Sequence, residues 1–225
     1  MPSRILKENI ETIYGRIKEK APPHHFEFQD PFWVLITTIL SHRTKDEVTD
    51  PAARRLFEQY KDPGGLSSAK QEDVERLINK VGFYKVKAER VIQAARIILE
   101  HYGGNVPVNA DDLMKIPGVG RKTANVVLAD SMGIPAIAVD THVFRISRRI
   151  GLSSGKKPGD VEADLMRIIP EKLWLGFNPV MVEFGKKICR PINPKCDICN
   201  ITEFCNFYRK NHAKSLKHDS NKQYG

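Results

Sequence analysis

No run of apolar residues in this chain of 225 residues is long enough to cross a membrane. The longest such stretch, residues 32–40, is interrupted by Thr37 and Thr38, whereas a membrane-spanning helix needs about 20 predominantly apolar residues. The N-terminus alternates charged with apolar residues and lacks the apolar core of a secretory signal peptide. These absences argue against a membrane partner and against export.

Strand signals are also scarce, because the one extended candidate, residues 134–139, is short and contains a proline. Apolar residues recur instead at helical spacing along most of the chain. Helices are expected at residues 5–17, 31–40, 44–60, 69–81, 85–102, 109–115, 121–132, 141–150, 159–169 and 179–188. Pro51 is expected to kink or split the third helix, and Ser68 is expected to cap the fourth. The sequence therefore predicts an all-α protein of about ten helices.

Acidic residues are outnumbered, with 27 Asp and Glu against 36 Lys and Arg, which gives a net charge of +9. A surplus of this size favours a polyanionic partner such as nucleic acid, although a solubility role explains it as well. Together with the missing signal peptide, the charge leads us to expect a cytoplasmic, nucleoid-associated location.

Cysteine is absent before residue 189, and the four cysteines then follow within seventeen residues: Cys189, Cys196, Cys199 and Cys205. A reducing compartment argues against disulfides between them. Only one Cys-x2-Cys pair is present, whereas four-cysteine zinc sites usually contain two, so the spacing favours a cubane iron–sulfur cluster and leaves zinc as the alternative. Arg190 and Lys195 lie between the first two ligands, where a loop held by a metal can contact phosphate.

Residues 116–123, IPGVGRKT, place a proline and two glycines directly before a helix. Gly118 and Gly120 are expected to permit positive φ and to leave backbone N–H groups unobstructed. The free N–H groups and the positive dipole end of the following helix point the same way, which suits a backbone phosphate. The pattern is typical of a helix-hairpin-helix element that binds DNA without reading its sequence, and an αα-hairpin without a ligand is the alternative. The expected DNA contacts are Gly118, Val119, Gly120, Arg121 and Thr123.

Lys122 lies in the first turn of that helix, where a contact with phosphate is its simplest role. The helix N-terminus and Arg121 both disfavour a protonated ammonium, so a neutral amine that can attack a sugar carbon becomes more available. Asp140 precedes a second helix and is expected to cap it. A carboxylate facing the same pocket as Lys122 would also stabilise an oxocarbenium-like sugar and relay protons, and the sequence leaves both roles open.

Three motifs occur in order: IPGVGRKTANVV at 116–127, VDTHVFR at 139–145, and the four-cysteine spacing. Together they resemble endonuclease III, a family of base-excision DNA glycosylases. The resemblance implies a monomer with a two-domain helix-hairpin-helix DNA glycosylase fold and a C-terminal [4Fe–4S] cluster loop. Residues 24–134 would form a six-helix domain, and residues 1–23 with 135–225 would form the iron–sulfur domain.

By matching position, the resemblance implies that Lys122 is the nucleophile, that Asp140 is an essential carboxylate, and that the four cysteines ligate the cluster. The family removes oxidised or saturated pyrimidines, such as thymine glycol, from double-stranded DNA after flipping out the nucleotide. It then nicks the abasic site by β-elimination. A monofunctional mismatch glycosylase of the same superfamily is one alternative, against which Lys122 argues. A non-catalytic iron–sulfur DNA-binding protein is another.

Arg43 is a departure, because the family often has glutamine at the matching position. That position is thought to fill the gap left by the flipped base, so arginine predicts an altered opposite-base preference, with a phosphate contact as the alternative. Phe83 matches the family's apolar wedge, with ordinary core packing as the alternative. His42 can line the pocket, although a capping or solvated role is favoured, and His142 either donates to a phosphate or simply begins its helix.

Overall fold

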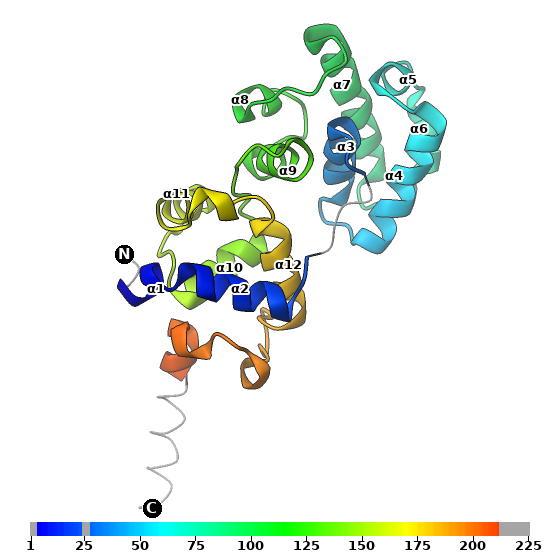
Figure 1. The fold of residues 1–225 in the computed structure, drawn as a ribbon. Coiled ribbons are helices and arrows are strands. Elements are labelled where there is room, and N and C mark those ends of the chain that lie inside the picture. Colours follow the sequence, from blue (N-terminus) through cyan, green and yellow to red (C-terminus); the bar gives the residue numbers. More distant parts are fainter. Residues whose placement is uncertain (1–3, 24–27, 212–225) are drawn as a thin grey trace, which may run out of the picture. The chain divides into compact units, whose positions relative to one another are not determined.

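The computed structural model describes residues 4–23 and 28–211. These residues form helices and contain no β-strand, which confirms the predicted all-α class (Figure 1). The chain divides into two compact units: one is Phe26–Ala138, and the other joins Met1–His25 to Val139–Gly225. No helix in the described part of the chain is long and apolar enough to cross a membrane.

The unit Phe26–Ala138 is built around one buried helix. Its helices are α3 (Pro31–Ser41), α4 (Asp46–Tyr60), α5 (Pro63–Ser67), α6 (Gln71–Leu77), α7 (Tyr84–Tyr102), α8 (Ala110–Leu113) and α9 (Arg121–Met132). Helix α3 packs against α4, α7 and α9. It begins where the side chain of Asp30 accepts a hydrogen bond from the backbone N–H of Trp33 at 3.1 Å, with Pro31 in the first turn.

The second unit combines the N-terminal helices with the C-terminal part of the chain. Its helices are α1 (Arg4–Glu8), α2 (Ile10–Lys20), α10 (Thr141–Ile150), α11 (Pro158–Ile168) and α12 (Phe177–Lys187), with 3₁₀ turns η1 (Glu171–Leu173), η2 (Cys196–Ile198) and η3 (Thr202–Phe204). Helix α12 packs against α2 and α10. Arg16 Nη1 donates to Asn200 O at 3.2 Å, and Asn200 Nδ2 donates to Arg16 O at 2.8 Å. These bonds tie α2 to the segment that carries the cysteines.

Two expectations about the helices are corrected by the structure. Pro51 does not split the helix, because α4 continues through it; the position is exposed, so the carbonyl that loses its N–H partner can bind water. Ser68 does not cap the next helix: its hydroxyl donates to the carbonyls of Gly64 and Gly65. It thereby closes α5, which sequence periodicity did not predict, and α6 begins only at Gln71.

Candidate functional site

The turn between α8 and α9 adopts the expected hairpin, but its two glycines differ. Gly118 has φ +86°, in the region that favours glycine, and a Cβ there would lie 3.0 Å from Arg90 Cδ. Gly120 has φ −102° and ψ 176°, so the expectation of positive φ is wrong for it. Val119 between them is buried in the core. The buried side chain of Val119 thus anchors the turn, and the positive φ of Gly118 sets its shape.

Gly120 is the N-cap of α9 and has no side chain to satisfy the first N–H groups of the helix. A Cβ built on it would meet no atom within 4 Å in the described part of the chain. The position therefore leaves open space directly beside the positive end of the helix dipole. Backbone N–H groups at such an end are an anion-binding site.

Thr123 is only 1% exposed, and its hydroxyl lies 3.0 Å from Nε2 of His42. Its side chain is therefore engaged inside the unit, and a phosphate contact from this residue would use its backbone N–H. Burial lowers the pKa of His42, and the positive charges of Lys122, Lys87 and Arg90 act in the same direction. A neutral His42 thus links the end of α3 to the first turn of α9, which also carries the half-buried Lys122.

Asp140 is the N-cap of α10, as its position predicts. Its Oδ1 accepts hydrogen bonds from the backbone N–H groups of His142 at 2.9 Å and Val143 at 2.8 Å. Both bonds fall on one carboxylate oxygen, so capping engages Oδ1. Asp140 and Lys122 belong to different units, and their approach in space stays a prediction of the sequence motifs.

The ring of His142 is fixed by its neighbours. Nδ1 lies 3.2 Å from Nη2 of Arg145, and a Cβ added to Gly185 would lie 2.3 Å from Nδ1. Because an arginine side chain can only donate, Nδ1 is the acceptor and the ring proton belongs to Nε2. Burial lowers the pKa of His142, while Asp140 acts in the opposite direction.

All four cysteines line one pocket, together with apolar side chains that include Ile150, Phe184, Ile188 and Ile201. Burial raises the pKa of the Cys199 thiol to about 11, and the neighbouring thiols act in the same direction. Among the described residues, no three His, Cys, Asp or Glu side chains converge closely enough to hold a single metal ion. The four thiols nevertheless share one pocket in which they can act together as ligands of one group.

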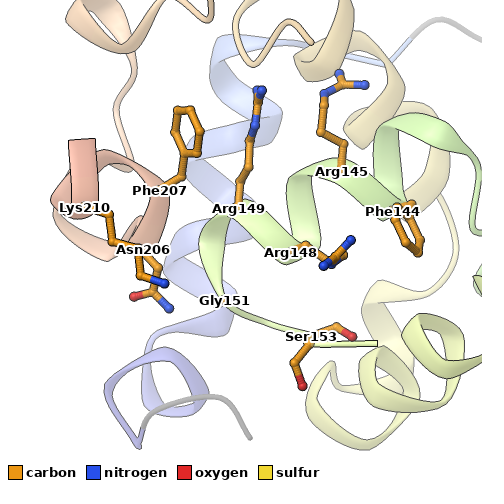
Figure 2. Close-up of a pocket in the computed structure, with 10 residues that line it drawn as sticks. Phe144, Arg145, Arg148, Arg149, Gly151, Ser153, Asn206, Phe207 and Lys210 are labelled. Atoms are coloured by element: carbon orange, nitrogen blue, oxygen red, sulfur yellow. The ribbon is translucent and has the colours of Figure 1, made fainter. Parts of the chain in front are cut away.

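Two arginines of α10 fasten the beginning of the cysteine segment. Arg145 donates through Nε and Nη2 to Cys189 O at 3.2 and 2.9 Å. Arg149 donates to Arg190 O at 2.6 Å and to Pro191 O at 2.8 Å. Figure 2 shows both side chains leaving α10. Helix α10 therefore supports the loop on which the exposed side chains of Arg190 and Lys195 are carried.

A basic pocket lies beside the same helix (Figure 2). Its lining includes the cations Arg145, Arg148, Arg149 and Lys210 and, among the described residues, no carboxylate. The guanidinium of Arg148 lies 5.2 Å from the centre of the Phe144 ring, which is cation–π geometry. The pocket concentrates part of the chain's positive charge on the unit that carries the cysteines.

Arg43 and Phe83 are both exposed, and Phe83 exposes 65% of its surface, so its side chain is not part of the core. Both have positive φ, 55° and 59°, although neither is glycine. Strained residues of this kind cluster at functional sites. Exposure therefore argues against the core-packing alternative for Phe83, whereas the phosphate-contact alternative for Arg43 stays open.

Sequence reasoning missed two ionisable residues with buried polar atoms in the unit Phe26–Ala138. Lys87 is 4% exposed, and its spacing of four from Val91, on the apolar face of α7, could have revealed it. Asp130 in α9 has an Oδ2 atom without a hydrogen-bond partner in the described part of the chain. Burial raises the pKa of Asp130 to about 6, and Lys122 acts in the opposite direction.

Comparisons with known proteins identify the family of this chain. A family model described as the HhH-GPD superfamily of base excision DNA repair proteins matches residues 36–171. Endonuclease III of Thermotoga maritima is 48% identical over 201 residues, covering 89% of this chain and 94% of that protein. A solved structure of a trapped covalent intermediate of endonuclease III with DNA has a TM-score of 0.84 at 36% identity, covering 92% and 98% of the two chains. The structure of a thermostable thymine-DNA glycosylase has a TM-score of 0.81 at 25% identity, covering 90% and 98%.

The helical fold and its glycine hairpin thus define a helix-hairpin-helix protein of the base excision DNA repair superfamily. Within that superfamily, the chain belongs to the endonuclease III family, as its three motifs indicated. A [4Fe–4S] cluster is a property of this family.

The two glycines of the hairpin provide a matched test of the anion-binding site. Gly120→Ser adds a preferred N-cap residue whose hydroxyl occupies the helix start, so the protein should keep its melting temperature and lose about tenfold in duplex affinity. Gly118→Ala should instead lower stability, because its φ of +86° and the nearby Arg90 disfavour a Cβ. Fluorescence anisotropy across several salt concentrations, with thermal melting in parallel, measures both. Wild-type affinity and salt dependence in Gly120→Ser would contradict this assignment.

Proposed function

We propose that this protein is a bifunctional DNA glycosylase that removes oxidised or saturated pyrimidines, such as thymine glycol, and nicks the resulting abasic site. The observation that carries the proposal is the position of Lys122. It stands in the first turn of α9, directly after the glycine hairpin, in a chain of the endonuclease III family. The similarity to a trapped covalent complex of endonuclease III with DNA supports an enzyme-bound intermediate.

In the proposed reaction, the neutral amine of Lys122 attacks C1′ of a flipped nucleotide, and the bond between C1′ and the damaged base breaks. The base leaves with the electron pair and takes up a proton. The nitrogen then loses a proton, and cleavage of the C1′–O4′ bond, with O4′ taking up a proton, opens the sugar to an iminium ion. The iminium acidifies the C2′ hydrogen, and loss of that hydrogen expels the 3′ phosphate by β-elimination, which nicks the strand 3′ to the lesion. Asp140 stabilises positive charge on the sugar and relays protons through Oδ2, while Oδ1 caps α10.

The proposed partner is double-stranded DNA that contains damaged bases or abasic sites, bound by a monomer. Backbone N–H groups at the start of α9 hold one phosphate. The exposed cations Arg190 and Lys195 contact the backbone, and His142 donates from Nε2. Phe83 enters the base stack, and Arg43 fills the gap and selects the opposite base.

We also propose that Cys189, Cys196, Cys199 and Cys205 hold a [4Fe–4S] cluster, with zinc as the alternative. Their shared pocket, their single Cys-x2-Cys pair and the cluster of the family support this assignment. The role we assign to the cluster is structural, because it would fix the loop that presents Arg190 and Lys195 to DNA. No step of the proposed reaction passes through it.

Borohydride trapping tests the nucleophile. Incubation of the protein with a duplex containing thymine glycol, followed by borohydride, should yield a covalent adduct that disappears in Lys122→Ala. Base release without an adduct would indicate a monofunctional glycosylase. Neither an adduct nor base release would indicate a non-catalytic DNA-binding protein. Gel electrophoresis of the adduct and chromatography of the released base distinguish the three outcomes.

Asp140 can be tested without removing its cap. Asp140→Asn keeps an amide oxygen that accepts the same backbone bonds but loses the negative charge. It should melt close to wild type and lose at least about a hundredfold in single-turnover excision. Asp140→Ala removes both functions and should also lose about 1 kcal/mol of stability. Excision at the wild-type rate in Asp140→Asn would mean that Asp140 is only a cap.

Metal analysis distinguishes the cluster from zinc. The purified protein should be brown, with broad visible absorbance and iron and sulfide in equal amounts, because zinc is d¹⁰ and colourless. Cys199→Ser should lose most of this absorbance and become less stable. A colourless protein containing stoichiometric zinc would contradict the cluster assignment, and this readout does not depend on activity.

A further inference from the structure

The turns that carry Arg43 and Phe83 are joined by one half-buried hydroxyl, that of Thr44. Thr44 Oγ1 accepts a hydrogen bond from the backbone N–H of Gly82 at 3.2 Å and another from Lys87 Nζ at 3.0 Å. The turns also pack closely, since a Cβ on Gly82 would lie 3.3 Å from both Arg43 O and Thr44 Oγ1. Thr44 and Gly82 are the direct neighbours of the two strained residues, so a bond between them fixes one turn relative to the other.

Lys87 holds both turns at once. Its Nζ donates to Leu40 O at 2.7 Å and His42 O at 2.6 Å, in addition to Thr44 Oγ1. Its backbone N–H donates to Phe83 O at 3.1 Å and so closes the first turn of α7. The three ammonium hydrogens therefore meet three oxygen acceptors on either side of Arg43, while the same residue's backbone fixes Phe83.

Burial of the Lys87 ammonium is energetically unfavourable. None of its hydrogen-bond acceptors in the described part of the chain is a carboxylate. Burial lowers its pKa to about 8, with Arg90 acting in the same direction, so the ammonium persists at neutral pH. If Lys87 only filled space, an apolar side chain of similar length would stabilise the fold more. The group instead satisfies carbonyls at the end of α3 and fixes the segment that follows.

We propose that Lys87 and Thr44 are positioning residues that lock the turns of Arg43 and Phe83 together, so that both side chains act on the duplex as one unit. The proposal rests on the proposed glycosylase function and deepens it. A fixed relation between the two strained turns would set which opposite base Arg43 accepts while Phe83 occupies the stack. Removal of the shared hydroxyl would then weaken lesion eversion and opposite-base selection without affecting the nucleophile.

Thr44→Val and Thr44→Ser form the matched pair for this test, because valine has nearly the shape of threonine and serine keeps the hydroxyl. The full chain is assayed by single-turnover excision of thymine glycol opposite each of the four bases. Nicking of an abasic site in a single-stranded oligonucleotide serves as reference, because it needs neither gap filling nor base selection. Thr44→Val should lose about tenfold in duplex excision and flatten the ranking of opposite bases, with reference nicking unchanged. Thr44→Ser should restore both the rate and the ranking.

Two results overturn the proposal while wild type is active. One is a wild-type duplex rate and ranking in Thr44→Val, and the other is an equal loss on duplex and reference substrates, which marks a general loss of structure. A wild-type chain that releases no base would overturn the proposed function itself and this inference with it. If Thr44→Val fails to fold, the coupling is tested with three other variants in the same excision assay: Arg43→Ala, Phe83→Ala and the double variant. The double variant should lose about as much as the more damaging single variant, whereas independent, multiplying losses overturn the coupling.

Discussion

The open N-terminus of α9 is the constraint on which the proposed chemistry depends. Gly118 turns the chain with a φ that other residues rarely adopt, and the buried side chain of Val119 anchors the turn in the core. Gly120 then begins the helix without a side chain over its first N–H groups. The proposed anion binding and the placement of Lys122 depend on the same few backbone angles, because both use the first turn of one helix.

In helix α10, unlike α9, a protein side chain satisfies the first backbone N–H groups. Asp140 closes the start of this helix with Oδ1, which satisfies two backbone N–H groups, and Arg145 and Arg149 further along hold the cysteine segment. The backbone N–H groups of His142 and Val143 are therefore not available to an external anion. The protein thus leaves one helix start open for phosphate and fills the other with its own carboxylate. The proposed site for the negative charge of DNA is thus the start of α9, and the negative charge of Asp140 lies at the start of α10.

Local patterns predicted most of the fold, because helical periodicity and capping residues act over a few neighbouring positions. They failed where the pattern was weak: α5 has the sequence PGGLS, with a single buried apolar residue, and Ser68 closes that helix instead of opening the next. The hairpin was predicted, but the extended angles of Gly120 were not. The contact between Thr44 and Gly82 joins positions 38 residues apart, and no local signal predicts it. Lys87 was missed because lysine is rarely fully buried.

The proposed cluster would add to protein contacts that already hold the two ends of the cysteine segment. Arginines of α10 hold residues 189–191, and Arg16 of α2 holds Asn200 and Glu203. The segment between these anchors carries Lys195 and two of the four cysteines, and its backbone is tied back by a bond from Lys195 N to Ile188 O at 3.0 Å. Burial favours neutral thiols around the shared pocket, so metal binding must displace protons. Thiolate bonds from both anchored ends and from the segment between them would then convert separate contacts into one rigid loop.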